Sequence, residues 1–436
     1  MRLRQRCEKD ARLGTIMLLI LVLTVTMIGQ DLDPCAKPPS PIQHDPNPCA
    51  TANNQENCLV AKLKIDSLVR EYNKYFTNDY RAVVGNIVPG SGFSAGAGFR
   101  CLWGDGNDWD VTKNNTFDAR AKVSTKGYWE FDSNLHINFE TNHKGAKPDK
   151  NLNLYGIVRD LRRLDFYGVG PESRKQDQAV FHYREAVLGL DFTLPLENWF
   201  DVGGAIEGVL PHITPITDLS IRSVERSFTE ASAPGISSQA PTLHLIAFAG
   251  FHGKGKPESW RLDYRFYYHF YRDLRGGRYS FRRFDADLKQ SLSLGDIELR
   301  LRGRLSLADV GSGKVQPFYL MRTLGGSDIT GTETLRGFSD YRFRDNDLVL
   351  AQAELAMPLY GPIDLFAFND VGKVAPSLKH FNVGRFRDTF GAGFSIVPSK
   401  LRSYLFRLYF AFGSGEGSQF FWGAGDPTTI GGRLVR

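Results

Sequence analysis

Most of the chain beyond residue 80 alternates between apolar and polar positions. From Arg261 to Tyr271, apolar and aromatic side chains stand at every second position, and mostly charged or polar residues stand between them. Successive side chains of a β-strand point to opposite faces, so such a segment has one apolar face and one polar face. The same alternation recurs at 117–124, 131–140, 284–289, 297–308 and 349–357. The pattern therefore predicts β-strands over most of the chain.

The number of these segments distinguishes two kinds of β protein. A secreted all-β protein also alternates, because one face of each strand lies in a core. Here about fifteen candidate strands, many of about 9 to 12 residues, follow one another over about 350 residues without a helical period between them. Aromatic residues gather near strand ends, where a bilayer has its interfaces: Trp199, Phe200, Phe420, Phe421 and Trp422. The sequence predicts an all-β fold, a transmembrane antiparallel β-barrel, with a secreted all-β protein as the alternative.

The strand count predicts one further strand. Bacterial single-chain barrels have an even number of strands, so we expect about 16. The first candidate strand covers the glycine-rich segment 83–100, and no candidate falls between 211 and 240. We expect the missing strand in this second interval.

The first 80 residues have a different organisation. Basic residues precede an apolar run from Ile16 to Ile28, which is the order of a secretory signal peptide at 1–30, with an uncleaved anchor helix as the alternative. Residues 31–80 follow as a periplasmic Pro-rich linker and a short amphipathic helix, whose apolar residues recur between Leu59 and Tyr72. This helix either lies against the barrel or plugs it. The barrel domain is expected at 81–436.

Four cysteines remain after the predicted signal peptide, namely Cys35, Cys49, Cys58 and Cys101. In an oxidising compartment an even number of cysteines predicts one or two disulfides, with free thiols as the alternative. No C-x-x-C spacing is present and the histidines do not gather near these cysteines, so we expect no metal site.

Composition narrows the function further. Glycine accounts for 44 of 436 residues and aromatics for 12%, which fits many short strands and glycine-rich turns. The formal net charge of +6 is small for this length, so nucleic acid is not an expected partner. Gly92–Gly96 matches the G-x-S-x-G motif of hydrolases, but it lies in a predicted strand rather than at a strand-to-helix turn. We therefore expect no enzyme activity and no cofactor.

One connection is longer than a turn requires. About 35 residues separate the strands near 300 and 350, and loops of that length are usually functional. An arginine that a loop carries into a barrel needs a carboxylate, because its guanidinium stays charged, and a two-point contact would fix the loop as well. The loop contains Gly325 and Gly326 and then Leu335, Arg336, Gly337 and Phe338; a later strand contains Phe368, Asn369, Asp370, Val371 and Gly372. Gly337 would allow a close approach or a positive φ beside the arginine.

These residues resemble the outer-membrane assembly-factor superfamily that includes BamA and TamA, also called the bacterial surface antigen family. Its hallmark is a [V/L]-R-G-[F/Y] tetrapeptide on a loop folded into the barrel, which Leu335–Phe338 matches. The resemblance implies that Arg336 pairs in the lumen with Asp370, within the family's F-x-D-x-G strand. It also implies a lateral gate between the first and last strands, where a client strand engages. We place the first of these strands at the glycine-rich segment near 92–98.

By this resemblance the expected function is to insert or translocate proteins at the outer membrane of a Gram-negative-type envelope. The expected partners are outer-membrane lipids and either unfolded barrel clients or a secreted passenger. A gated or passive channel is one alternative, and a secretion barrel for a separately encoded partner is another. Family members such as BamA carry periplasmic POTRA domains of about 75 residues, and we expect none in the roughly 50 residues between the signal peptide and the barrel. Charged residues on the lumen face, such as Arg300 and Arg304, are expected to form a hydrated lining of paired charges.

Overall fold

The computed structural model describes residues 80–103, 115–139, 150–255, 259–360, 363–381, 384–396 and 406–423. The predicted signal peptide, linker and amphipathic helix lie outside these residues, as do Cys35, Cys49 and Cys58. The expectations for those segments and for the disulfides stay predictions. Cys101 is described, and it is exposed on strand β2.

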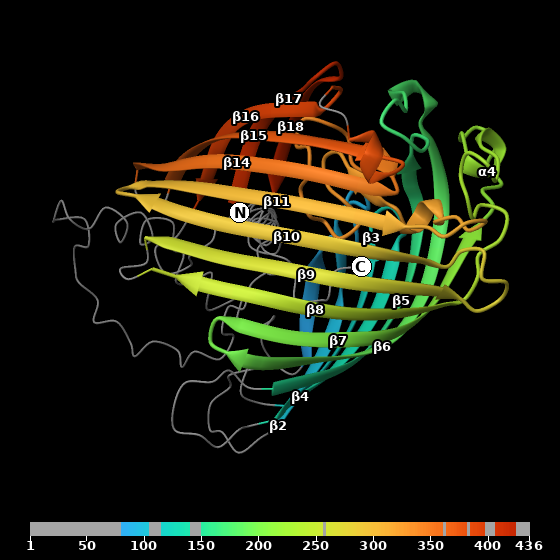
Figure 1. Ribbon diagram of the computed structural model, residues 1–436, viewed down its shortest axis with the longest axis horizontal. Coiled ribbons are helices and arrows are strands. Elements are labelled where there is room, and N and C mark those ends of the chain that lie inside the picture. Colours follow the sequence, from blue (N-terminus) through green and yellow to red (C-terminus); the bar gives the residue numbers. More distant parts are fainter. Residues whose placement is uncertain are drawn as a thin grey trace, which may run out of the picture.

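Sixteen strands form one sheet, in which each strand pairs antiparallel with its neighbour. In Figure 1, β7 to β14 cross the front of the molecule and β3 to β5 lie behind them, so the sheet curls around an interior. The predicted all-β barrel of about 16 strands is confirmed. In chain order its strands are β1 (Tyr80–Gly85), β2 (Ser94–Trp103), β3 (Asn115–Ser124), β4 (Trp129–Phe139), β5 (Lys150–Phe166), β6 (Ala179–Glu197), β7 (Phe200–Thr214), β8 (Thr242–Lys254), β9 (Trp260–Asp273), β10 (Phe281–Leu294), β11 (Ile297–Asp309), β14 (Asp347–Tyr360), β15 (Ile363–Ala375), β16 (Arg387–Ile396), β17 (Phe406–Gly413) and β18 (Gly417–Gly423).

The other elements are short. Strands β12 (Arg322–Leu324) and β13 (Phe343–Asp345) pair with each other in the long loop between β11 and β14. A single turn of α-helix, α4 (Val224–Ser227), lies between β7 and β8. The described residues also contain three 3-10 turns: η3 (Lys175–Asp177), η4 (Phe318–Leu320) and η5 (Leu378–His380). Within the described residues, no helix has the length and apolar character needed to cross a membrane.

The strand missing from the sequence prediction is β1, and the expectation that it lies between 211 and 240 is wrong. The candidate segment 83–100 contains two strands, β1 and β2, joined by a turn in which Gly90 and Gly92 have φ values of +80° and +78°. Glycine adopts positive φ without a steric cost, so these two glycines allow the chain to turn between β1 and β2. With only six residues, β1 is too short for its alternation to stand out from the turn that follows.

The glycine-rich strand is therefore the second of the sheet, and the expectation that it forms the seam is also wrong. The edges of the sheet order are β1 and β18. β2 pairs with β1 on one side and with β3 over ten residues on the other. A Cβ on Gly96 would lie 1.8 Å from the carbonyl oxygen of Ala121, so this glycine permits a close approach of strands. Ser94 of the G-x-S-x-G match donates its hydroxyl to the carbonyl of Gly85 at 2.7 Å, as part of this hairpin.

The alternation seen in the sequence separates an apolar outer face from a polar inner face. On β9 and β10, Tyr268 and Phe284 are 49% and 36% exposed, whereas His269 and Asp285 are 0% and 8% exposed. A barrel surface with exposed aromatic and aliphatic side chains on every second residue suits contact with lipid. Further exposed outer-face residues are Leu188, Leu210, Phe390, Phe410, Phe420 and Trp422.

The two ends of the barrel differ. The connections 167–178, 215–241 and 310–346 lie at one end, which we call the loop end and which is at the right of Figure 1. The connections 198–199 and 295–296 lie at the other, which we call the turn end. Outer-membrane barrels have short periplasmic turns and longer extracellular loops.

Candidate functional site

The loop of residues 310–346 is the candidate functional site. It leaves β11, folds back on itself through the β12–β13 pair and returns as β14. The tip between β12 and β13 contains all the residues that the sequence singled out in this loop. Leu335, Arg336, Gly337 and Phe338 are each buried.

Gly325 and Gly326 turn the chain from β12 into the tip. Their φ values are +113° and +33°. A Cβ on Gly325 would lie 2.5 Å from the Cβ of Arg342, and a Cβ on Gly326 would lie 2.4 Å from Oδ1 of Asp340. Because positive φ disfavours other residues and the space is filled, both positions require glycine.

Arg336 and Asp370 form a two-point ion pair inside the barrel. Nε and Nη2 of Arg336 donate to the two carboxylate oxygens at 2.9 and 2.7 Å, and the backbone N–H of Arg336 donates to the same carboxylate at 3.1 Å. The Thr389 hydroxyl and the Gln352 amide also donate to Asp370, at 3.1 and 3.2 Å. Asp370 is 0% exposed and Arg336 is 4% exposed. This geometry fixes both the position and the orientation of the loop tip.

A second carboxylate, Glu354 on β14, shares the arginine. Nη1 of Arg336 donates to Glu354 at 2.7 Å, and Glu354 also pairs with Arg300 at 3.1 Å and with Arg407 at 2.6 Å. The guanidinium of Arg336 stands 3.5 Å from the ring centroid of Phe368. Buried charges persist when each has an opposite charge and hydrogen bonds. Alternation places Glu354 on the lumen face, but no local signal in the sequence selects it as the second partner.

Gly337 is required for a close backbone contact, not for a positive φ. A Cβ at this position would lie 2.6 Å from both the carbonyl carbon of Phe412 and the backbone nitrogen of Gly413. The same restriction applies to Gly413, because a Cβ on Gly413 would lie 2.6 Å from the carbonyl oxygen of Gly337. The loop tip therefore lies directly on the backbone at the end of β17.

Leu335 and Phe338 lie in an apolar cluster beneath the loop. Its other buried members are Leu324, Phe343, Leu348, Leu350 and Val374. The Phe338 and Phe343 rings pack edge to face with centroids 5.2 Å apart. Gly372 leaves room for Leu324 of this cluster, since a Cβ at Gly372 would lie 2.9 Å from Cδ1 of Leu324. The structure thus brings the predicted tetrapeptide together with Phe368, Asp370 and Gly372.

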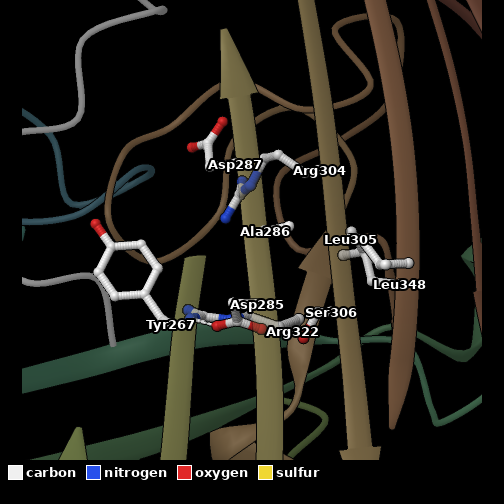
Figure 2. Close-up of a pocket in the computed structure, with 9 residues that line it drawn as sticks. All are labelled: Tyr267, Asp285, Ala286, Asp287, Arg304, Leu305, Ser306, Arg322 and Leu348. Atoms are coloured by element: carbon white, nitrogen blue, oxygen red, sulfur yellow. Dashed lines mark hydrogen bonds and ion pairs between the residues drawn. The ribbon is translucent and has the colours of Figure 1, made fainter. Parts of the chain in front are cut away.

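A second group of ion pairs holds β12 and the loop tip. Arg322 pairs with Asp285 of β10, and Arg304 of β11 pairs with Asp328 of the loop at 3.0 Å. Figure 2 shows Arg322 beside Asp285, with Asp287 and Arg304 further along the neighbouring strands around a small polar pocket. The sequence placed Arg304 in a paired lining but did not show that its partner is on the loop.

The loop also packs on the opposite wall. The ring of Phe318 lies 4.9 Å from that of Phe166 on β5 and 5.0 Å from that of Phe181 on β6, and all three are buried. Since Arg336 contacts β15 and Gly337 contacts β17, the loop spans the lumen near the loop end. The sequence did not single out these aromatics, because their contacts lie far apart along the chain.

Comparisons with known proteins give the fold. No protein-family model and no curated protein match the chain. The solved structure of BamA from Haemophilus ducreyi lacking POTRA domains 1–3 is similar, with a TM-score of 0.52 and 15% identity over 79% of this chain and 69% of that chain. CdiB from Escherichia coli has a TM-score of 0.52 and 9% identity over 79% of this chain and 61% of that chain. The chain therefore has the fold of a BamA-like β-barrel.

Proposed function

We propose that this chain is an outer-membrane barrel that inserts or translocates proteins through a lateral seam between β1 and β18. The observation that carries the proposal is the loop anchor, in which Arg336 bonds to Asp370 and Glu354 inside a barrel of BamA-like fold. It is the arrangement that the resemblance in the tetrapeptide implied. Its proposed partners are outer-membrane lipids and either unfolded barrel clients or a secreted passenger.

The membrane placement rests on the outer face. Exposed apolar residues recur around the sheet, from Leu188 on β6 to Phe390 on β16 and Phe420 on β18. Burying such a surface in lipid removes an unfavourable contact with water. The longer connections define the loop end, which we place on the extracellular side.

The position of the seam rests on strand length. β1 has six residues and β18 has seven, whereas β6 has 19 and β7 has 15. Both short strands stand at the edges of the sheet order, and an edge strand offers backbone groups to an added strand. Strands this short can share only a few ladder hydrogen bonds with each other, so little has to break for them to separate.

A channel is the second candidate, and the polar inner face favours it. Arg265 pairs with Asp201 at 2.8 Å and His252 pairs with Asp201 at 2.7 Å, so charged groups line the lumen toward the turn end. Conduction through the whole barrel would require the loop to leave the loop end.

Cysteine crosslinking tests the seam. After replacement of the native cysteines, one cysteine is placed in Tyr80–Gly85 and one in Gly417–Gly423, and the full chain is oxidised in vesicles. The readout is insertion of a urea-unfolded eight-stranded barrel. A matched control pairs Tyr264→Cys with Leu288→Cys, which face each other on β9 and β10.

We expect the seam crosslink to abolish insertion, while the β9–β10 crosslink leaves it unchanged. Full insertion by the seam-locked protein would reject the lateral route. Planar-bilayer conductance of the locked protein would then test the channel.

A further inference from the structure

Two consecutive loop residues contact the two hairpins that flank the seam. Tyr341 and Arg342 lie just before β13, near the loop end. One contacts the turn between β1 and β2, and the other contacts the turn between β17 and β18.

On the first side, the hydroxyl of Tyr341 donates to the carbonyl of Pro89 at 3.0 Å. Pro89 lies in the β1–β2 turn. The ring of Tyr341 is 4% exposed and belongs to the apolar cluster that includes Val88 of the same turn and Tyr128. This hairpin is therefore held to the loop by a hydrogen bond and by buried apolar surface.

On the second side, Nε of Arg342 donates to the Glu416 carboxylate at 2.7 and 3.0 Å, and Nη2 approaches it at 2.6 Å. Glu416 lies in the β17–β18 turn. The side chains are 2% and 12% exposed, so water screens the pair weakly. Arg342 also donates to the backbone carbonyl of Ser173 at 2.7 Å, which fixes its guanidinium to the connection between β5 and β6.

The backbone at this point is in a conformation that few residues adopt. Tyr341 has φ of +56°, although it is not glycine. A bulky residue in the left-handed region is strained and persists only where the surroundings hold it. Here this conformation allows adjacent side chains to point to opposite sides of the seam.

We propose that Tyr341 and Arg342 form a clasp that holds the seam closed at the loop end. The inference deepens the proposed function and rests on its seam, since it concerns how that seam is regulated. The contacts of the clasp lie at the loop end, so β1 and β18 separate from the turn end, the side from which an unfolded client would arrive. Because the two links join the edge hairpins in series through the loop, breaking either one frees the seam at the loop end.

Spin-label distances in the full chain test the clasp without any client. Labels at Val84→Cys and Phe420→Cys report the separation of β1 and β18 in phosphatidylcholine vesicles, after replacement of native cysteines. The variants are Tyr341→Phe, Glu416→Gln and the two combined. Tyr128→Phe is the matched control, because its hydroxyl also donates to a backbone carbonyl, that of Arg163, within the same apolar cluster.

We expect Tyr341→Phe to raise the separated population about fivefold, as the loss of one hydrogen bond would. Glu416→Gln should raise it as well. The double variant should open by about the sum of the two single increases, because a seam held by two links in series opens when either link breaks. Tyr128→Phe should leave the distances unchanged.

An opening of the double variant equal to the product of the two single increases, or equal opening in Tyr128→Phe, would show that these residues only stabilise the barrel and would overturn the clasp. Unchanged distances in Tyr341→Phe would do the same. Client insertion is measured separately. If the seam opens in Tyr341→Phe while the protein inserts no client, the clasp stands and the proposed function fails.

Discussion

The wall around Asp370 and the edge strand β1 use the same chemistry in different surroundings. On β15, Asp370 is fully buried and binds an arginine that also bonds to Glu354. On β1, Arg81 reaches across β2 to Asp118 of β3, whose side chain is 14% exposed and also pairs with Arg100. The Arg336–Asp370 pair is buried beneath the packed loop, whereas the Arg81–Asp118 pair attaches a strand of only six residues to the sheet. The comparison indicates that the barrel holds its loop firmly and its seam loosely.

The largest effect is expected at the buried anchor. Arg336→Ala leaves Asp370 buried without its opposite charge, whereas Glu354 keeps Arg300 and Arg407. Losing one partner of a buried pair costs about 3 to 5 kcal/mol. The free energy of unfolding of the full chain in urea, in lipid, measures this. Arg385→Ala is the control, because Arg385 is 74% exposed and its pair with Glu172 should contribute at most about 1 kcal/mol. Equal losses in the two variants would contradict the firm anchor.

A smaller effect is expected where the loop lies on β17. Gly337→Ala forces a Cβ against the backbone of Phe412 and Gly413, and overpacking of this kind costs about 1 to 3 kcal/mol. Gly276→Ala is the matched control, because no atom lies within 4 Å of a Cβ there. We expect the control to change the unfolding free energy by less than about 0.5 kcal/mol. A neutral Gly337→Ala would mean that the loop does not press on β17.

At the edge we expect a local effect. Asp118→Asn weakens the pairing with Arg81, so amide hydrogens of Tyr80–Gly85 should exchange faster, and the free energy of unfolding should change less than in Arg336→Ala because a short edge strand can open locally. Hydrogen exchange followed by mass spectrometry measures both β1 and β15. Loss of protection in β15 as well would show that the edge and the anchor are one cooperative unit.

The smallest effect concerns pH. Burial raises the pKa of Asp340, in the loop, from 3.8 to about 6. A raised pKa means that the folded chain binds this proton more tightly than the unfolded chain does. The protonated carboxyl therefore adds its full contribution to the free energy of unfolding below about pH 4, and this contribution is lost as the pH rises through about 6. Unfolding free energies at pH 4 and pH 7 should differ less in Asp340→Asn than in the natural chain. An unchanged difference would place the titrating group elsewhere.

The alternation of the strands and the content of the loop could be read from the sequence. Side-chain direction in a strand repeats every two residues, so neighbouring residues such as Tyr268 and His269 can be assigned to opposite faces of the sheet from the local sequence alone. The tetrapeptide at 335–338 and the acid at 370 were visible as motifs. The split of 83–100 into two strands was not, because β1 offers few alternating positions and the turn glycines resemble those of a strand.

The sequence by itself determined the barrel, its approximate strand number and the pair that the loop was expected to make, because each depends on a short-range pattern or a compact motif. Only the tertiary structure decided which strands stand at the edges and that Glu354 shares Arg336. It alone placed Tyr341 and Arg342 between the two edge hairpins. Tyr341 and Pro89 are 252 residues apart in the chain, and contacts over such distances depend on how the whole sheet curls rather than on any local preference.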